Sequence, residues 1–315
     1  MSLKRILLFF LPLALVVGVV LYYPVTKTSA ISIPLPVERA VHLLADPTYI
    51  KKWYQPFTDA NTDTSHQSDK QWQLTNGDLQ LSLRNKNTIS ATLLLTEKNQ
   101  EAAFFYHTTL DSNYIDQTKV TMTYKKNWLG NFNGRNKLID LAETSLQSLA
   151  TYASNTVRLY GLEIRHKDVT DSAYLFTQKT TSWAEVKTTV QSLYKDLVNF
   201  ADANKIDKNG AKIINIKILS GDSIRVSAGL AIQQYINLPL NGKITYRTMP
   251  YGKKLLEAPF KGRYADLPQA FQSLDQYARD HKLTNMAIAY GKFSDDRTDY
   301  EQGDIIDMMV YYPVD

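Results

Sequence analysis

The chain has 315 residues, of which 44% are hydrophobic and 21% charged, so its composition is that of a globular protein, and its length allows about two domains. It contains no cysteine, which excludes disulfides, cysteine nucleophiles and thiolate metal sites. The net charge is +5, but lysine and arginine are scattered among acidic residues, so we expect a solvated basic surface and no nucleic-acid partner.

Residues 1–29 predict a membrane anchor followed by a linker. Lys4 and Arg5 precede an uncharged run, 6–23, that would span about 27 Å as a helix, close to the hydrocarbon thickness of a bilayer. Tyr22 and Tyr23 lie where an interfacial aromatic pair is expected. The alternative is a cleaved signal peptide, for which residues 28–30 offer a small-residue cleavage site.

The two basic residues before the apolar run favour a cytoplasmic N-terminus. We therefore expect a single-pass bacterial protein of the cytoplasmic (inner) membrane, with residues 6–23 in the lipid bilayer and the soluble domains on the extracytoplasmic (periplasmic) side. A lipoprotein is excluded because no cysteine follows the run.

Residues 30–153 predict a first α+β domain. A strand at 31–35 and a helix at 37–44 are followed by strands at 71–75, 79–84, 88–96, 102–109 and 119–124, and then by a helix at 137–152. Asn76-Gly77-Asp78, between the strands at 71–75 and 79–84, is a strong hairpin signal.

This order of elements resembles the SRPBCC or START-like fold, also called polyketide-cyclase-like. The residues that carry the resemblance are Pro36, Glu38, Ala40, Val41, Leu44, Asp46, Pro47 and Trp53. The resemblance implies a helix-grip domain, in which a curved sheet wraps a long helix and leaves an apolar cavity. A ligand there would contact residues such as Trp53, Phe104, Phe105 and Tyr106; the alternative is that these aromatic residues are core.

Residues 156–315 predict a second domain with an internal repeat. Strands at 160–165 and 172–178 precede a helix that begins at a capping box, Ser182 to Glu185, and runs to about residue 204. Strands at 212–219 and 223–232 follow. A strand at 254–259, a helix at 267–281 and strands at 285–293 and 304–312 then repeat the strand-helix-strand-strand order.

The start of the second repeat contains residues that favour turns and the beginning of a helix. Pro250 and Gly252 mark a turn, and Gly262 is free to take a positive φ where the chain reverses. Asp266 is a good N-cap, and Pro268 suits the first turn of the helix that follows.

This stretch resembles the second half of a GyrI-like domain, the small-molecule-binding module also found as the effector domain of AraC-type regulators. The matching residues are Pro250, Gly252, Lys253, Gly262, Tyr264, Leu267, Phe271 and Leu274, and residues 311–314 match the end of the family's final strand. The resemblance implies two halves related by a pseudo-twofold axis, whose sheets form a groove for a ligand.

On this resemblance we expect Tyr264, Tyr290, Phe293 and Trp183 to line the groove. Gly291 stands where many members carry a glutamate that points into the groove, which weakens a hydrolase interpretation. Glu257, on the neighbouring strand, is the nearest replacement; its alternative is a solvent-facing strand residue.

The sequence shows no catalytic, metal or cofactor motif: the five histidines form no H-E-x-x-H pair, and G-x-S-x-G, P-loop and G-x-G-x-x-G patterns are absent. We therefore expect a membrane-anchored, non-catalytic binding protein that holds a small amphipathic or aromatic molecule in its second domain. The alternative is an accessory or structural subunit that docks a membrane-protein assembly through both domains. A hydrolase or cyclase is the third hypothesis.

Overall fold

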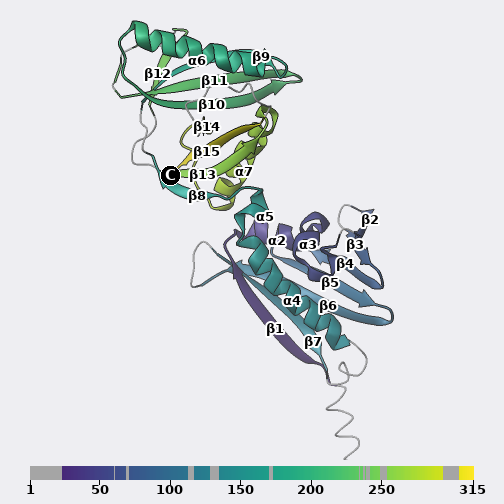
Figure 1. The fold of residues 1–315 in the computed structure, drawn as a ribbon. Helices are drawn as coiled ribbons and strands as arrows, with labels where there is room; N and C mark the ends of the chain where they lie inside the picture. Colours follow the sequence, from purple (N-terminus) through teal and green to yellow (C-terminus); the bar gives the residue numbers. More distant parts are fainter. Residues whose placement is uncertain are drawn as a thin grey trace, which may run out of the picture. The chain divides into compact units, whose positions relative to one another are not determined.

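The computed structural model describes residues 23–59, 61–68, 71–112, 117–127, 135–169, 173–233, 235–236, 238, 242–248, 254–293 and 305–315. The chain divides into two compact units, 1–155 and 156–315, and each unit contains one antiparallel sheet with helices, an α+β architecture (Figure 1). The predicted anchor at 6–23 lies, except for Tyr23, outside the described residues.

Within the described ranges, the structure has no helix that is both long and apolar enough to cross a bilayer.

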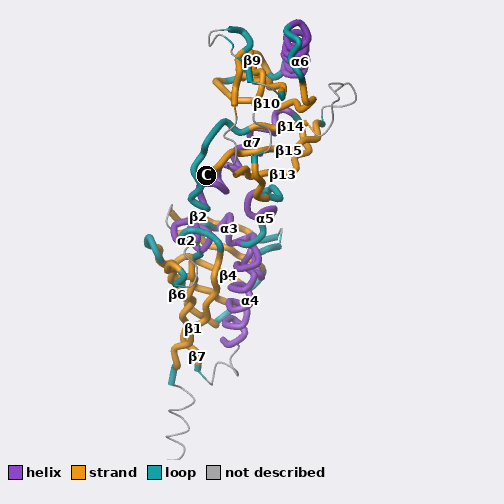
Figure 2. The backbone as a smooth tube through the Cα atoms, turned by 90° about the vertical axis from the view of Figure 1, so that its left-hand side faces the viewer, coloured by secondary structure: helices purple, strands orange, loops and turns teal. Residues whose placement is uncertain are grey.

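The first unit is a seven-stranded sheet packed against one long helix. Its elements are β1 (Val25–Ile33), α2 (Val37–Ala45), α3 (Pro47–Trp53), a 3-10 turn (Gln55–Phe57), β2 (Asp63–Ser68), β3 (Gln71–Asn76), β4 (Leu79–Lys86), β5 (Ser90–Glu97), β6 (Gln100–Leu110), β7 (Thr118–Lys126) and α4 (Arg135–Ala153). The strand order is β1-β7-β6-β5-β4-β3-β2. Figure 2 shows α4 lying beside the strands as a second layer.

The local sequence explains the main features of this unit. Gly77 has a φ of +58°, as the predicted hairpin between β3 and β4 requires. The Asp46 carboxylate accepts the backbone N–H of Thr48 at 2.8 Å and so caps α3. Helix α4 buries Leu146 and Leu149 completely against the strands, and each such leucine stabilises the fold by roughly 1.5–3 kcal/mol.

The second unit is an eight-stranded sheet with two main helices. Its elements are α5 (Thr156–Tyr160), β8 (Arg165–Asp168), β9 (Ala173–Ser182), α6 (Val186–Ala203), β10 (Lys208–Ser220), β11 (Ser223–Ile232), β12 (Thr245–Thr248), β13 (Lys254–Gly262), a 3-10 turn (Tyr264–Asp266), α7 (Leu267–Asp280), β14 (Tyr290–Phe293) and β15 (Ile306–Val314). The strand order is β12-β9-β11-β10-β14-β15-β13-β8.

The predicted repeat is present and symmetric. Repeat one, β9-α6-β10-β11, and repeat two, β13-α7-β14-β15, meet where β10 pairs with β14. Helix α6 packs on β9 and β11, while α7 packs on β13, β15 and β10. The outer strands are exchanged: β8 precedes repeat one but pairs with β13, and β12 precedes repeat two but pairs with β9.

Several sequence-based expectations for this unit were wrong. Residues 160–164 are not part of a strand, and β8 begins only at Arg165. The helix α5 ends at Tyr160, because Gly161 takes a φ of +79° and its N–H donates to the Val157 carbonyl at 2.9 Å. The strand expected over 285–293 is confined to 290–293, with one isolated bridge at Asn285.

The predicted helix cap at Ser182–Glu185 and the predicted positive φ of Gly262 are also wrong. The capping box is wrong because α6 begins at Val186 and the Glu185 carboxylate accepts the Thr181 hydroxyl at 3.0 Å. Gly262 does not take a positive φ; a Cβ there would lie 2.9 Å from the Phe260 ring, so space is the reason for a glycine. The Pro250–Gly252 turn lies outside the described residues.

Candidate functional site

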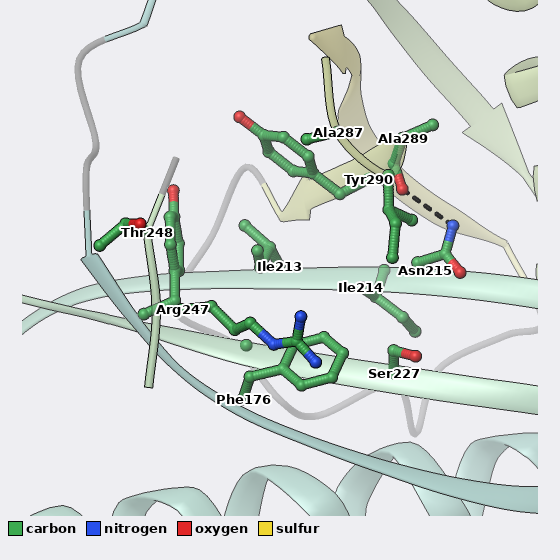
Figure 3. Close-up of a pocket in the computed structure, with 13 residues that line it drawn as sticks. Phe176, Ile213, Ile214, Asn215, Ser227, Arg247, Thr248, Ala287, Ala289 and Tyr290 are labelled. Atoms are coloured by element: carbon green, nitrogen blue, oxygen red, sulfur yellow. Dashed lines mark hydrogen bonds between the residues drawn. The ribbon is translucent and has the colours of Figure 1, made fainter. Parts of the chain in front are cut away.

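A partly open cavity of about 240 Å³ lies on the second sheet, on the face away from α6 (Figure 3). Strands β9 to β12 and the segment that leads into β14 supply its walls. The residues that line it are Tyr174, Phe176, Ile213, Ile214, Asn215, Ser227, Gly229, Arg247, Thr248, Ala287, Ile288, Ala289 and Tyr290.

The alternation of side chains along the strands creates this face. Tyr174 and Phe176 of β9 point into the cavity, and the residue between them, Leu175, belongs to the opposite face, which α6 covers. On β11, Gly229 lies in the cavity wall opposite Phe176, while its neighbour Leu230 is buried on the helix side. The helix α6 therefore lies on the face of this half of the sheet opposite the cavity.

Hydrogen bonds hold the cavity wall in place. The Asn215 side-chain amide donates to the Ala289 carbonyl at 2.8 Å and ties the segment before β14 to β10 (Figure 3). From beneath the sheet, the buried Tyr194 hydroxyl donates to the Ile213 carbonyl at 2.6 Å. A wall fixed in this way can bind a ligand without first being ordered.

Among the described residues that line it, the cavity is mostly apolar and carries one charged side chain. The Arg247 guanidinium lies 5.0 Å from the centre of the Phe176 ring, a cation–π geometry. Ser227 and Thr248 add hydroxyl groups, whereas Ile288 at the mouth is 62% exposed. Apolar walls with a few polar groups are typical of small-molecule sites.

The structure brings Tyr290 to this cavity. Its ring stacks on that of Tyr311, with 5.2 Å between centroids and 26° between planes. Burial raises the pKa of Tyr311, although the nearby Lys167 ammonium opposes the rise. Lys167 in turn pairs with Glu257 at 3.3 Å, so the Glu257 carboxylate is neutralised beside the Tyr290–Tyr311 stack and outside the cavity lining.

The other three predicted residues lie elsewhere in the unit. Phe293 is three residues from Tyr290, so it faces the helix side, where it meets the Tyr194 ring edge-on at 6.1 Å. Tyr264 is buried in the 3-10 turn before α7. Trp183 follows β9, and its backbone N–H donates to the Asp222 carboxylate at 3.4 Å. The ligand-binding roles given to the five residues stay predictions.

Gly291 also lies on the helix side of the sheet. It pairs with Ile214, and a Cβ added to it would overlap the sulfur of the buried Met308. A side chain at this position would therefore point into the packed helix-side layer and not into the cavity. The absence of a glutamate here accordingly says nothing about the charge of the cavity.

Sequence reasoning missed Arg247, the charged side chain of the cavity, and Phe176, whose ring lies beneath its guanidinium. Arg247 lies on β12, a four-residue edge strand with polar neighbours that has no period long enough to be detected. The alternation of β9 does put Tyr174 and Phe176 on one face, and this was the available signal.

The first unit has a buried aromatic core and a separate, largely polar hollow. Trp53, Phe104 and Tyr106 are fully buried core residues, whereas Phe105 is 44% exposed on the other face of β6. A hollow of about 960 Å³ lies between the α2–α3 junction and strands β3 and β4; its lining is largely polar and includes His42 and Arg84. This hollow lacks the mostly apolar lining of the cavity in the second unit.

Three tyrosine hydroxyls in the core of the first unit are unusual. Tyr54, Tyr106 and Tyr152 are almost wholly buried. The Tyr54 and Tyr106 hydroxyls interact with each other, and the Tyr152 hydroxyl has no hydrogen-bond partner among the residues that the structure describes. Burial raises the pKa of all three, and Tyr106 raises that of Tyr54 further. These hydroxyls therefore remain protonated at neutral pH.

No cluster suited to a metal ion occurs in the described part of the chain, where three or more His, Asp or Glu side chains nowhere gather in one place.

No protein-family model and no curated protein matches the chain. Among solved structures, the EcmrR C-terminal domain is 12% identical with a TM-score of 0.38, covering 49% of this chain and 98% of that one. An uncharacterized conserved protein from Listeria innocua is 11% identical with a TM-score of 0.33, covering 48% and 92%. The Zhui aromatase/cyclase from Streptomyces sp. R1128 is 12% identical with a TM-score of 0.33, covering 44% and 99%.

Proposed function

We propose that this chain is a non-catalytic binding protein that holds a small amphipathic or aromatic molecule in the cavity of its second unit. The observation that carries the proposal is the partly open, mostly apolar cavity of about 240 Å³ on the sheet face that the helices leave free. The two symmetric β-α-β-β repeats, and the resemblance of residues 248–277 to GyrI-like domains, support it. On this proposal Tyr290 contacts the ligand.

The proposal includes the rest of the chain. Residues 6–23 anchor it in the cytoplasmic membrane, and both units lie on the extracytoplasmic side. The order strand, two helices, six strands and long helix in the first unit supports a helix-grip, SRPBCC-like domain. Trp53, Phe104 and Tyr106 are fully buried core residues, which supports a structural role for this unit and a ligand site in the second one.

The test is a titration with N-phenyl-1-naphthylamine, an uncharged aromatic probe whose fluorescence rises in apolar sites. We expect saturable binding that Ser227→Phe abolishes, because Ser227 lines the cavity and is 7% exposed. Thr180→Phe is the matched control, since Thr180 is an exposed residue on the same face of β9 that lies outside the lining. Binding that is absent, or equal in both variants, refutes the proposal.

Native mass spectrometry of the full chain extracted in mild detergent separates the alternatives. A retained small molecule supports the binding proposal and identifies its natural ligand. A stoichiometric protein partner without a small molecule would instead indicate an accessory subunit of a membrane assembly.

A further inference from the structure

The pseudo-symmetry of the second unit allows its two halves to be compared position by position. Strand β12 lies beside β9, the first strand of repeat one, and β8 lies beside β13, the first strand of repeat two. Each outer strand carries a cation in a comparable place. Arg247 lies opposite Tyr174, the second residue of β9, and Lys167 lies opposite Leu255, the second residue of β13.

The two halves differ in how this cation is balanced. The fourth residue of β13 is Glu257, whose carboxylate pairs with Lys167 at 3.3 Å. The fourth residue of β9 is Phe176, and Arg247 lies over its ring at 5.0 Å. A ring face attracts a cation but carries no net charge, so the positive charge of Arg247 is left at the cavity.

Where the structure describes the surroundings of the cavity, they do not supply the missing negative charge. Among the described residues, none that lines the cavity is acidic, and Arg247 forms no ion pair with a carboxylate. The same face continues with two more exposed cations, Lys217 and Arg225, which lie opposite each other next to the Asn215–Ser227 pair. Opposite residues of antiparallel strands share a face, so this end of the sheet is basic.

We propose that the cavity selects an anionic amphiphile, with a carboxylate, sulfonate or phosphate head at Arg247 and an apolar or aromatic body against Phe176, Ile213 and Tyr290. This inference rests on the proposed function and specifies its ligand class. A guanidinium binds such oxyanions through two parallel N–H donors, and the ring beneath it leaves those donors free at its edge. The Lys167–Glu257 half offers no equivalent site because its charge is already paired.

The test compares two probes that share one ring system. 1-Anilinonaphthalene-8-sulfonate carries a sulfonate, and N-phenyl-1-naphthylamine is the same skeleton without it. We expect the sulfonate probe to bind at least about fivefold more tightly at low salt, since one charge pair near a protein surface contributes about 1 kcal/mol or more. The preference should shrink as added salt screens the pair.

Variants of Arg247 test whether this side chain causes the preference for the sulfonate probe. Arg247→Gln should remove the preference while leaving the uncharged probe bound, and Arg247→Lys should retain most of it. Lys167→Gln is the matched control, because Lys167 holds the comparable place outside the cavity lining and should leave both affinities unchanged. Arg247 is exposed, so its replacement should preserve the fold, which circular dichroism checks.

The outcomes separate this inference from the proposed function. Equal affinity for the two probes, or a sulfonate preference that survives Arg247→Gln, overturns the anionic selectivity while cavity binding stands. If neither probe responds to Ser227→Phe, the cavity is not a binding site, and both proposals are refuted.

Discussion

Two glycines on opposite faces of the second sheet test whether the cavity face can be perturbed separately from the helix face. A Cβ added to Gly229 would lie 2.6 Å from Ile213 Cγ1 and 3.0 Å from Ile213 Cδ1, on the cavity side. A Cβ added to Gly291 would overlap the Met308 sulfur on the helix side. Neither glycine has a positive φ, so alanine would be resisted by side-chain overlap alone.

The expected magnitude follows from the overlap. Carbon atoms in contact normally lie about 3.5–4.0 Å apart, so alanine at Gly229 intrudes by about 1 Å. Overpacking of this kind costs about 1–3 kcal/mol, and we expect both Gly229→Ala and Gly291→Ala to lower the free energy of unfolding by an amount in that range. The two variants should therefore be similarly destabilised.

The affinity for a ligand should distinguish Gly229→Ala from Gly291→Ala. Because Ile213 and Gly229 both line the cavity, Gly229→Ala should displace the Ile213 side chain within the proposed ligand site. We expect affinity for N-phenyl-1-naphthylamine to fall about tenfold in Gly229→Ala and to be unchanged in Gly291→Ala. Urea unfolding and a fluorescence titration on the same samples give both quantities. Equal losses of affinity in the two variants would refute the assignment of faces.

Three further predictions concern the first unit and the N-terminus. Tyr152→Phe should raise the free energy of unfolding by about 1 kcal/mol, because a buried hydroxyl without a partner is costly. Tyr124→Phe, which loses a hydrogen bond to Glu143, should lower it; calorimetry measures both. Burial, assisted by Glu143, raises the pKa of Tyr124 to about 12. The contribution of the Tyr124 hydroxyl to stability should therefore be complete below about pH 10 and lost as the pH rises through 12. The absorbance of the protein should show an alkaline step that Tyr124→Phe removes. The full chain should fractionate with membranes and resist carbonate extraction, whereas residues 24–315 alone should be soluble; a soluble full chain would contradict the anchor.

Strong periodicity in the sequence predicted the long elements well. The apolar stripe that predicted a helix at 137–152 corresponds to α4, and Leu138, Leu146 and Leu149 are fully buried as that pattern requires. The hairpin signal at Gly77 and the strand-helix-strand-strand repeat are likewise present. These features depend on residues close together in the chain, so a local pattern is sufficient to find them.

Features fixed by contacts between distant residues could not be predicted in this way. Strand β12 exists because residues 245–248 pair with 173–176 of β9, and the four-residue segment has no signature of its own. The sequence predicts Glu185 as a capping residue, yet the Glu185 carboxylate accepts a hydrogen bond from the Thr181 hydroxyl at 3.0 Å instead. In both places a tertiary partner overrides the local preference.

The candidate site shows the same division at the level of single side chains. Tyr290 and Phe293 were both expected in the groove, but an odd separation along a strand puts them on opposite faces, and only Tyr290 lines the cavity. The two-residue period of a strand is a local rule, so the sequence was sufficient to separate these two side chains. The contact of Arg247 with Phe176 joins residues 71 positions apart in the chain, so no local pattern reveals it.

The asymmetry of the two halves implies a stoichiometry. Repetition of one strand order would give two equivalent sites on the sheet if the side chains were also equivalent. In repeat two, Tyr311 is buried against Tyr290, Lys167 lies 5.7 Å above the Tyr311 ring, and Glu257 neutralises that lysine, so side chains occupy the comparable place. A ligand suited to Arg247 therefore meets one competent half, and calorimetric titration should find one molecule bound per chain. Two equivalent sites would mean that the difference between Phe176 and Glu257 does not control binding.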